Sequence, residues 1–151
     1  MLRLNLATDY GLRILLFLAH APDDTPSTGE IAHFYRISPD HVRKVARQLA
    51  QHHFVTTVRG RSGGLRLARP PGSISVGEVV ELLEGPTGLL ECVLHDGVCV
   101  VQPQCRLRHV LADAGARLIA DLRRVMLSEL VADGGELVRL DPAPTIPIAR
   151  P

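Results

Sequence analysis

Three cysteines lie close together in the second half of the chain, at Cys92, Cys99 and Cys105. Because there are only three, one disulfide among them would leave a thiol over, and two disulfides are impossible. Six and then five residues separate them, which is wider than the CxxC pairs that place two zinc ligands on one tight turn. Thiolates spread along a loop suit an iron–sulfur cluster, because its ligand positions are several ångströms apart and it prefers sulfur donors.

Other interpretations of the cysteines stay open at this point. His95 or His109 could complete a three-cysteine zinc site, the thiols could form a redox-sensitive disulfide, or the three side chains could be buried with no common role. In the cluster interpretation, three thiolates leave one iron without a protein ligand. The fourth ligand would then come from another residue, the partner chain or a small molecule, and an open position there is accessible to a diatomic gas.

The segments that carry the cysteines differ in pattern. Residues 86–104 show no hydrophobic periodicity, which predicts a cluster-binding loop. From Cys105 onward, apolar residues return at three- and four-residue steps, and residues 105–135 are predicted to form a long helix and a short terminal helix. A long helix at the end of a small domain lacks partners within its own chain, so we expect it to be a dimerisation helix. Residues 136–151 are expected to form a flexible tail.

Residues 1–85 are predicted to form a winged helix-turn-helix domain. Three helix start signals precede amphipathic stretches, at Thr8, Thr28 and Ser38-Pro39. Period-two alternation beside the glycine-rich residues 60–64 predicts a β-hairpin, which is the wing of such a domain. The predicted fold class is therefore mainly α with a small β-hairpin, a winged helix-turn-helix domain followed by a long C-terminal dimerisation helix.

A fourth helix is predicted immediately after the hairpin. Ser75 and Glu78 have the spacing of a capping box, and the apolar run that follows stops at Gly85-Pro86. The third helix should bury one apolar face and leave its polar and basic residues exposed. Its predicted buried residues are Val42, Val45, Ala46 and Leu49.

The exposed faces of the third helix and the wing form a candidate DNA-binding surface. The helix supplies side chains for base edges and phosphates, and an arginine of the wing fits a minor groove. The alternative is a solvated basic face with no ligand. The candidate DNA-binding residues are Ser38, Asp40, His41, Arg43, Lys44, Arg47, Arg59, Arg61, Ser62 and Gly63.

Charge and composition support a protein that meets a polyanion with one end. Residues 1–70 contain ten lysines and arginines against five acids, whereas residues 71–151 contain seven against eleven. Aromatic residues make up only 3% of the chain, which argues against stacking platforms for single-stranded nucleic acid. There is no apolar run of about 18 residues and no secretory signal, so we expect a cytoplasmic protein without a membrane partner.

An enzyme and a scaffold are the competing function classes. No Ser-His-Asp grouping, phosphate loop or HExxH motif is evident, and residues 60–64 lack the strand-to-helix context of a nucleotide loop. We therefore expect no enzymatic activity. A scaffold that binds a protein through the long helix would differ from a DNA-binding protein in lacking steeply salt-dependent DNA affinity.

Three stretches together resemble one family. They are residues 8–13 (TDYGLR), residues 58–67 (VRGRSGGLRL), and the cysteines, the third of which begins Cys-Arg-Leu. Over about residues 1–135, the chain is similar to the bacterial iron–sulfur winged-helix repressors of the NsrR and IscR type. The resemblance implies a homodimer that binds operator DNA, with the three cysteines holding a cluster, [4Fe-4S] in preference to [2Fe-2S].

Two details distinguish the branches of that family. IscR-type members have a histidine three residues after the third cysteine, where this chain has Arg108, with His109 one place later. NsrR-type members lack that histidine, and in some of them an N-terminal aspartate of the other subunit completes the cluster. Asp9 stands in the matching motif, although a carboxylate in the first helical turn is also favoured by the helix dipole alone. The first cysteine spacing, six residues instead of five, departs from the family pattern.

The resemblance therefore favours the NsrR-type branch and a specific regulatory role. It implies a transcriptional repressor that leaves its operator when nitric oxide modifies the cluster. Oxygen, iron status or redox poise are alternative effectors, with control of cluster assembly or another stress regulon as the output. A thiol-based or zinc-based switch is the alternative chemistry.

Overall fold

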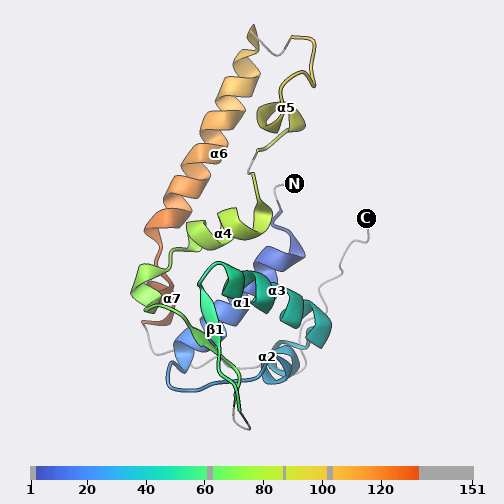
Figure 1. Ribbon diagram of the computed structural model, residues 1–151. Helices are drawn as coiled ribbons and strands as arrows, with labels where there is room; N and C mark the ends of the chain where they lie inside the picture. Colours follow the sequence, from blue (N-terminus) through green and yellow to red (C-terminus); the bar gives the residue numbers. More distant parts are fainter. Residues whose placement is uncertain (1–2, 61–62, 87, 102–103, 133–151) are drawn as a thin grey trace.

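The computed structural model describes residues 3–60, 63–86, 88–101 and 104–132. It confirms the prediction of a mainly α chain with a small β-hairpin, which is antiparallel (Figure 1). The predicted tail, residues 136–151, lies outside the described residues, as do Arg61 and Ser62 of the wing. In chain order the elements are α1 (Leu6–His20), α2 (Thr28–Tyr35), α3 (Pro39–Gln51), β1 (Val55–Thr57), β2 (Leu65–Leu67), the 3-10 turn η1 (Pro71–Ser73), α4 (Val76–Glu84), α5 (Glu91–Leu94), α6 (Arg106–Arg124) and α7 (Leu127–Val131).

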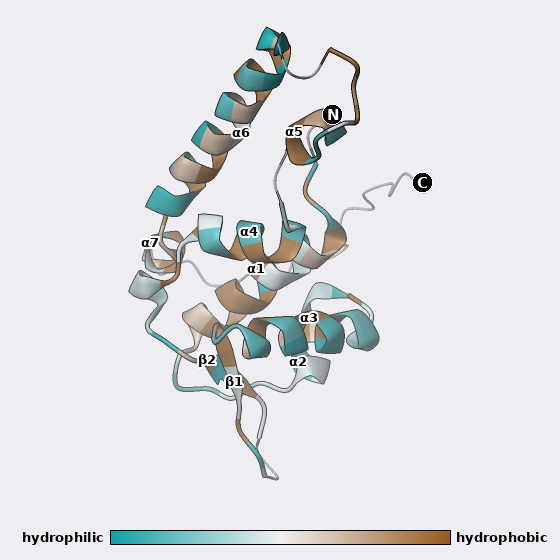
Figure 2. Cartoon of the chain, turned by 45° about the horizontal axis from the view of Figure 1, so that its top comes forward, coloured by the Kyte–Doolittle hydropathy of each residue, from teal (hydrophilic) through white to brown (hydrophobic). Residues whose placement is uncertain are grey.

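The hydrophobic core lies where α1 crosses α3 and α4. Gly11 of α1 permits this crossing, because a Cβ there would touch Val45 of α3 at 3.6 Å and overlap the Leu83 side chain of α4. The predicted buried face of α3 is confirmed. Figure 2 shows α3 largely in the hydrophilic colour beside the more hydrophobic α1, as expected for a helix that faces solvent on its other side. Buried side chains from these three helices are Ile14, Leu15, Leu18, Val42, Val45, Ala46, Leu49, Val79, Val80 and Leu83.

Two predicted helix caps are wrong by a few residues. The α1 helix begins at Leu6 with Asn5 as its cap, whose side-chain oxygen accepts a hydrogen bond from the Thr8 backbone N–H at 2.9 Å. Thr8 is fully buried inside the first turn instead. The α2 helix is capped by Ser27 in a capping box with Glu30, so Thr28 is its first helical residue. Both corrections have one cause, since a chain with adjacent Asn, Ser or Thr residues offers several oxygens that can accept the first N–H groups.

The hairpin is short and is anchored to the loop between α1 and α2. Its register pairs Val55 with Leu67 and Thr56 with Arg66. The Leu65 N–H donates to the Pro26 carbonyl at 2.9 Å, and a Cβ on Gly64 would collide with that same loop backbone. The side chains of Val55 and Leu65 are buried, whereas Arg66 is exposed. One face of the hairpin therefore packs on the core and the other faces outward.

The predicted fourth helix is confirmed with its cap and its end. Ser75 and Glu78 form the capping box, and α4 stops at Glu84 with Gly85 after it. The segment before α4 also pairs with the turn between α6 and α7. The Val76 N–H donates to the Val125 carbonyl at 2.9 Å, which ties the end of α6 to the start of α4.

The α6 helix extends away from the hairpin, with α5 beside its N-terminal part (Figure 1). Only Gly115 and Ile119 of α6 are buried, whereas Leu107 and Val110 are 60% and 58% exposed. The C-terminal end of α6 also packs tightly against the start of α4, since a Cβ on Gly77 would lie 2.6 Å from the Arg123 backbone nitrogen. The α5 helix was not predicted, because four residues are too few to show a helical period. Within the part of the chain described, no helix is long and apolar enough to span a membrane.

Candidate nucleic-acid interface and cysteine site

The exposed face of α3 presents the predicted contact residues to solvent. The apolar residues of α3 pack inward, so the side chains between them point away from the core. At the start of the helix, Ser38 occupies the cap position but makes no side-chain cap hydrogen bond. An exposed hydroxyl in that position can donate to a ligand or accept from one. The residues placed on this exposed surface are Ser38, Asp40, His41, Arg43, Lys44 and Arg47.

The predicted residues of α3 differ in whether they already have partners. Arg43 forms an ion pair with Asp40 one turn earlier. His41 lies against Tyr10 of α1, with ring centroids 6.0 Å apart. Lys44 and Arg47 form no ion pair with any of the described residues. These two side chains are therefore the cations of α3 that can meet a phosphate without first losing a partner.

Glycines set the geometry of the wing tip. Gly60 has φ of 126°, a conformation that only glycine adopts easily. The Gly63 N–H donates to the Gly60 carbonyl at 3.0 Å, and a Cβ on Gly63 would collide with the Val58 carbonyl. The tight turn holds the exposed Arg59 beside it. The backbone at Gly60 and Gly63 carries no side chain that would keep a ligand at a distance.

The three cysteines lie along the segment between α4 and α6. Cys92 is half-buried on α5, Cys99 is exposed in the following loop, and Cys105 is half-buried at the cap position of α6. None of them forms a disulfide. Among the described residues, no three histidine, cysteine, aspartate or glutamate side chains lie close enough together to hold a metal ion. The donor set fits an iron–sulfur cluster by its chemistry, but the single chain does not bring the thiols together.

An ion pair holds part of this loop against α6. Arg108 on α6 donates to the Asp96 carboxylate at 2.8 Å. Arg108 occupies the position that distinguishes the branches of the resembled family, and here its guanidinium is paired with a carboxylate of the same chain. His95, one of the histidines considered for a zinc site, lies 3.7 Å from Glu91 on α5. The loop is thus shaped by contacts with its own neighbours.

Asp9 lies in the first turn of α1, as predicted, and pairs with Arg13 at 2.8 Å. The Arg13 guanidinium in turn lies 5.7 Å from the centre of the Tyr35 ring on α2. Burial raises the pKa of Tyr35 to about 12, and this phenol is therefore neutral at physiological pH. Within one chain, Asp9 is part of an α1–α2 contact and forms no metal-binding group with the cysteines.

Sequence reasoning missed two arginines near the hairpin, Arg66 and Arg69. The Arg69 guanidinium lies 4.7 Å from the Phe54 ring centre and 3.3 Å from Glu78. Hydrogen bonds from the Ser75 backbone and hydroxyl, with Arg69 nearby, lower the pKa of Glu78 below its usual range. Arg66 is exposed on the outer hairpin face. The period-two alternation of β2 was the signal that could have placed Arg66 outside.

Comparison with known proteins identifies the family. The model of the Rrf2 family, described as an iron-dependent transcriptional regulator, matches residues 4–133. The chain belongs to the Rrf2 family. The HTH-type transcriptional regulator NsrR of Bacillus subtilis (strain 168) is 38% identical over 141 residues, which cover 92% of this chain and 97% of the relative. NsrR of Halalkalibacterium halodurans has the same identity and coverage.

Solved structures show the same Rrf2 fold. The B. subtilis global cysteine regulator CymR aligns with a TM-score of 0.71 at 23% identity, covering 88% of this chain and 98% of that one. IscR of T. potens aligns with a TM-score of 0.72 at 24% identity, covering 89% and 90%. The family match and the sequence relatives show a transcriptional regulator of the NsrR type, since these relatives are regulators and not enzymes.

Proposed function

We propose that this Rrf2 protein is a repressor that binds double-stranded operator DNA as a homodimer through α3 and the wing. The observation that carries the proposal is the two-faced α3, whose apolar side is fully used by the core while Lys44 and Arg47 remain unpaired on the other side within the described structure. Its N-terminal residues Ser38, Asp40 and His41 are the candidates for base edges. Arg59 beside the wing glycines is the candidate for a minor groove.

The homodimer is supported by the surface of α6. Leu107, Val110 and Leu118 are exposed on a helix that touches the rest of the chain mainly through its C-terminal half. Their spacing of three and eight residues places them along one side of the helix. A twofold mate would cover these side chains and would set the separation of the two α3 helices on the DNA.

The effector proposal concerns the cysteines. We propose that Cys92, Cys99 and Cys105 hold an iron–sulfur cluster, [4Fe-4S] in preference to [2Fe-2S], with the partner's Asp9 as fourth ligand. When bound, the cluster supplies iron that nitric oxide can modify. The thiols do not form a three-ligand group in the single chain, so binding a cluster would draw the loop together. The protein with a cluster and the protein without one would then favour different arrangements of the loop, and loss of the cluster would shift the protein from one to the other.

Residues of the chain connect this site to the DNA-binding surface. Cys105 occupies the N-terminal cap position of α6, and α6 ends at Arg124, beside the backbone pairing of Val125 with Val76. Asp9 is next to Tyr10, which contacts His41 of α3. Loss of a bond to Asp9 would let α1 shift, and α3, which packs against α1, would move with it as one unit. Repression would end because the two states differ in operator affinity.

The test measures DNA affinity before and after nitric oxide. Anaerobically purified protein is titrated against its own upstream DNA at several salt concentrations, with and without stoichiometric nitric oxide. We expect affinity that falls steeply with salt and drops after treatment. Unchanged affinity after treatment would reject the effector, and salt-independent binding would reject the DNA interface.

The cysteine assignment has its own test. We expect Cys92→Ala, Cys99→Ala and Cys105→Ala proteins to be colourless, to lack iron and acid-labile sulfide, and to bind operator DNA more weakly. Asp9→Ala should retain iron but give an altered visible spectrum. If all three cysteine variants keep the visible absorbance of the unmodified protein, these thiols are not the ligands.

A further inference from the structure

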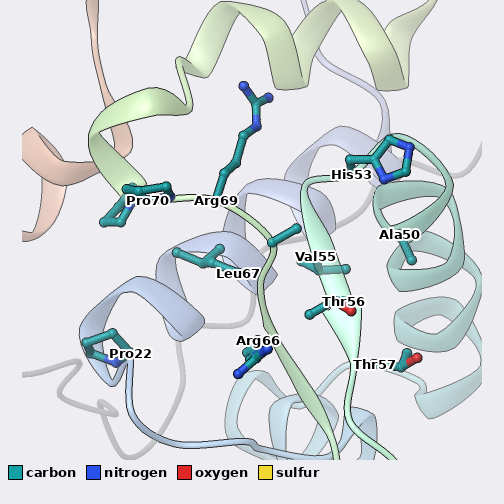
Figure 3. A pocket seen from close by; sticks show the side chains of 12 residues that line it. Pro22, Ala50, His53, Val55, Thr56, Thr57, Arg66, Leu67, Arg69 and Pro70 are labelled. Atoms are coloured by element: carbon teal, nitrogen blue, oxygen red, sulfur yellow. The ribbon is translucent and has the colours of Figure 1, made fainter.

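An open pocket of about 790 Å³ lies on the hairpin, beside the end of α3 (Figure 3). The cross-strand pair of Thr56 and Arg66 lines it, and these two residues lie opposite each other in register. His53, two residues after the end of α3, lines the pocket as well, and so does Pro22, two residues after the end of α1. The pocket is therefore continuous with the helix and the hairpin that form the proposed DNA-binding surface.

The polar side chains of this pocket can all donate a hydrogen bond. Thr56 and Thr57 carry hydroxyls, Arg66 carries a guanidinium and His53 an imidazole. None of the described residues that line the pocket is an aspartate or a glutamate. A pocket with several donors and no carboxylate is suited to an anion.

The two arginines of the pocket have different roles. Arg69 is held by the Phe54 ring, the Ser73 carbonyl at 2.9 Å and the Glu78 carboxylate, so an internal carboxylate compensates its charge. Arg66 is exposed and forms no ion pair with any residue that the structure describes. Arg66 is therefore the cation of this pocket that remains available to a ligand.

We propose that this pocket binds the sugar–phosphate backbone of duplex DNA, outside the bases that α3 contacts, with Arg66 as the cation and Thr56 as a neutral donor. The pocket is an open depression that adjoins α3, which favours an extended polyanion lying along the surface over a single enclosed ion. Phosphate contacts position a protein on DNA without reading bases. This inference rests on the proposed DNA-binding function, which it deepens by adding a contact that lies outside both α3 and the wing tip.

The experiment measures how steeply DNA binding depends on salt. Full-length, anaerobically purified protein is titrated by fluorescence anisotropy against a labelled random-sequence duplex at increasing salt. Log K falls as log salt rises, and removing one cation that neutralises a phosphate should reduce the magnitude of this slope by about 0.9. We expect Arg66→Gln to lower the slope magnitude by about that amount per subunit, and Arg66→Lys to retain the slope of the unmodified protein because the charge is kept.

Two further variants separate this inference from the proposed function. Arg47→Gln on α3 should also lower the slope, whereas Arg117→Gln, an exposed position on α6, should leave it unchanged. If Arg47→Gln lowers the slope and Arg66→Gln does not, the pocket assignment fails and the α3 interface stands. If the unmodified protein shows no salt-dependent duplex binding, the proposed function itself fails.

A small-anion site would be the competing explanation of the same chemistry. Calorimetry with inorganic phosphate alone distinguishes it from DNA. Phosphate binding that Arg66→Gln abolishes, together with an unchanged DNA slope, would overturn the DNA assignment. Circular dichroism and the thermal midpoint of each variant should match those of the unmodified protein, since Arg66 is exposed and contributes nothing to the core.

Discussion

The part that carries α3 and the part that carries the cysteines are built differently. We call residues 3–86 with 127–132 the head, and residues 88–124 the arm. The head buries side chains from every α-helix it contains, among them Leu15 of α1 and Leu127 of α7, at 0% and 2% exposure. Of the residues described in the arm, only Gly115 and Ile119 of α6 are buried, and the loop beside Cys99 exposes Val98 and Val100.

This difference assigns different work to the two parts. A head with a complete core keeps one arrangement, so its exposed face can hold α3 and the wing in a constant relation. An arm with exposed apolar side chains has surface left to bury, and its stable arrangement therefore depends on what binds it. A regulator needs both properties, because the DNA-binding surface of the head must keep its shape while the arm must have two states.

The largest expected effect comes from opening the core of the head. Leu15→Ala removes a fully buried side chain of α1, and we expect it to lower the free energy of unfolding by about 2–5 kcal/mol. Chemical denaturation monitored by circular dichroism measures this. Val100→Ala is the matched control, because that valine of the arm is 98% exposed and should change the free energy of unfolding by about 0.5 kcal/mol or less. Equal losses in the two variants would contradict the division into head and arm.

Substitutions on the exposed side of α6 in the arm should weaken dimer formation, whereas substitutions in the core of the head should lower the free energy of unfolding. Leu107→Ser combined with Val110→Ser removes two apolar side chains from the exposed side of α6. Burying one such side chain contributes about 1.5–3 kcal/mol, so we expect the dimer dissociation constant to rise at least about tenfold. Sedimentation equilibrium over a range of concentrations measures it.

Leu130→Ser on α7 provides the control for that assembly experiment. Leu130 is 47% exposed but lies outside α6, and its loss should leave the dissociation constant unchanged. If the α6 variant and the α7 variant dissociate equally, the proposed dimer surface is not α6.

The head was predicted well because its signals are local. Ser75 and Glu78 predicted the start of α4, and the spacing of Val42, Val45 and Leu49 predicted the buried face of α3. The cap of α1 was misplaced because Thr8 and Asn5 are equally acceptable as caps in sequence, and only packing shows that Thr8 is buried.

The site was less predictable because its contacts are not local. The pairing of Arg108 with Asp96, and the position of Arg69 between Phe54 and Glu78, join residues that no periodic pattern relates. In the proposed site, the arrangement of the cysteines depends on groups outside a single chain. Sequence spacing shows which thiols are near one another along the chain, but not which of them bind the same metal centre.

The smallest expected effect lies at the joint between the hairpin and α4. The lowered pKa of Glu78 means that the folded state favours its charged form. That stability is present above the usual glutamate value of 4.5 and is lost as the pH falls through the lower folded-state pKa. We expect Glu78→Gln to flatten the decline of stability in acid, with an effect at neutral pH of about 1 kcal/mol or less, because the pair with Arg69 is partly exposed. Denaturation midpoints measured across this pH range test it.

Glu30→Gln gives the matched comparison, because it alters the same kind of group without the arginine. Glu30 also forms a capping box, with Ser27, and that hydrogen bonding lowers its pKa, but the α2 helix has no counterpart of the Arg69 contact in the described structure. A larger change for Glu78→Gln than for Glu30→Gln would show that Arg69 couples the hairpin to α4. Equal changes would mean that the capping box alone accounts for the acid dependence, and that the hairpin is held at this joint by the Phe54 stacking and the Ser73 carbonyl.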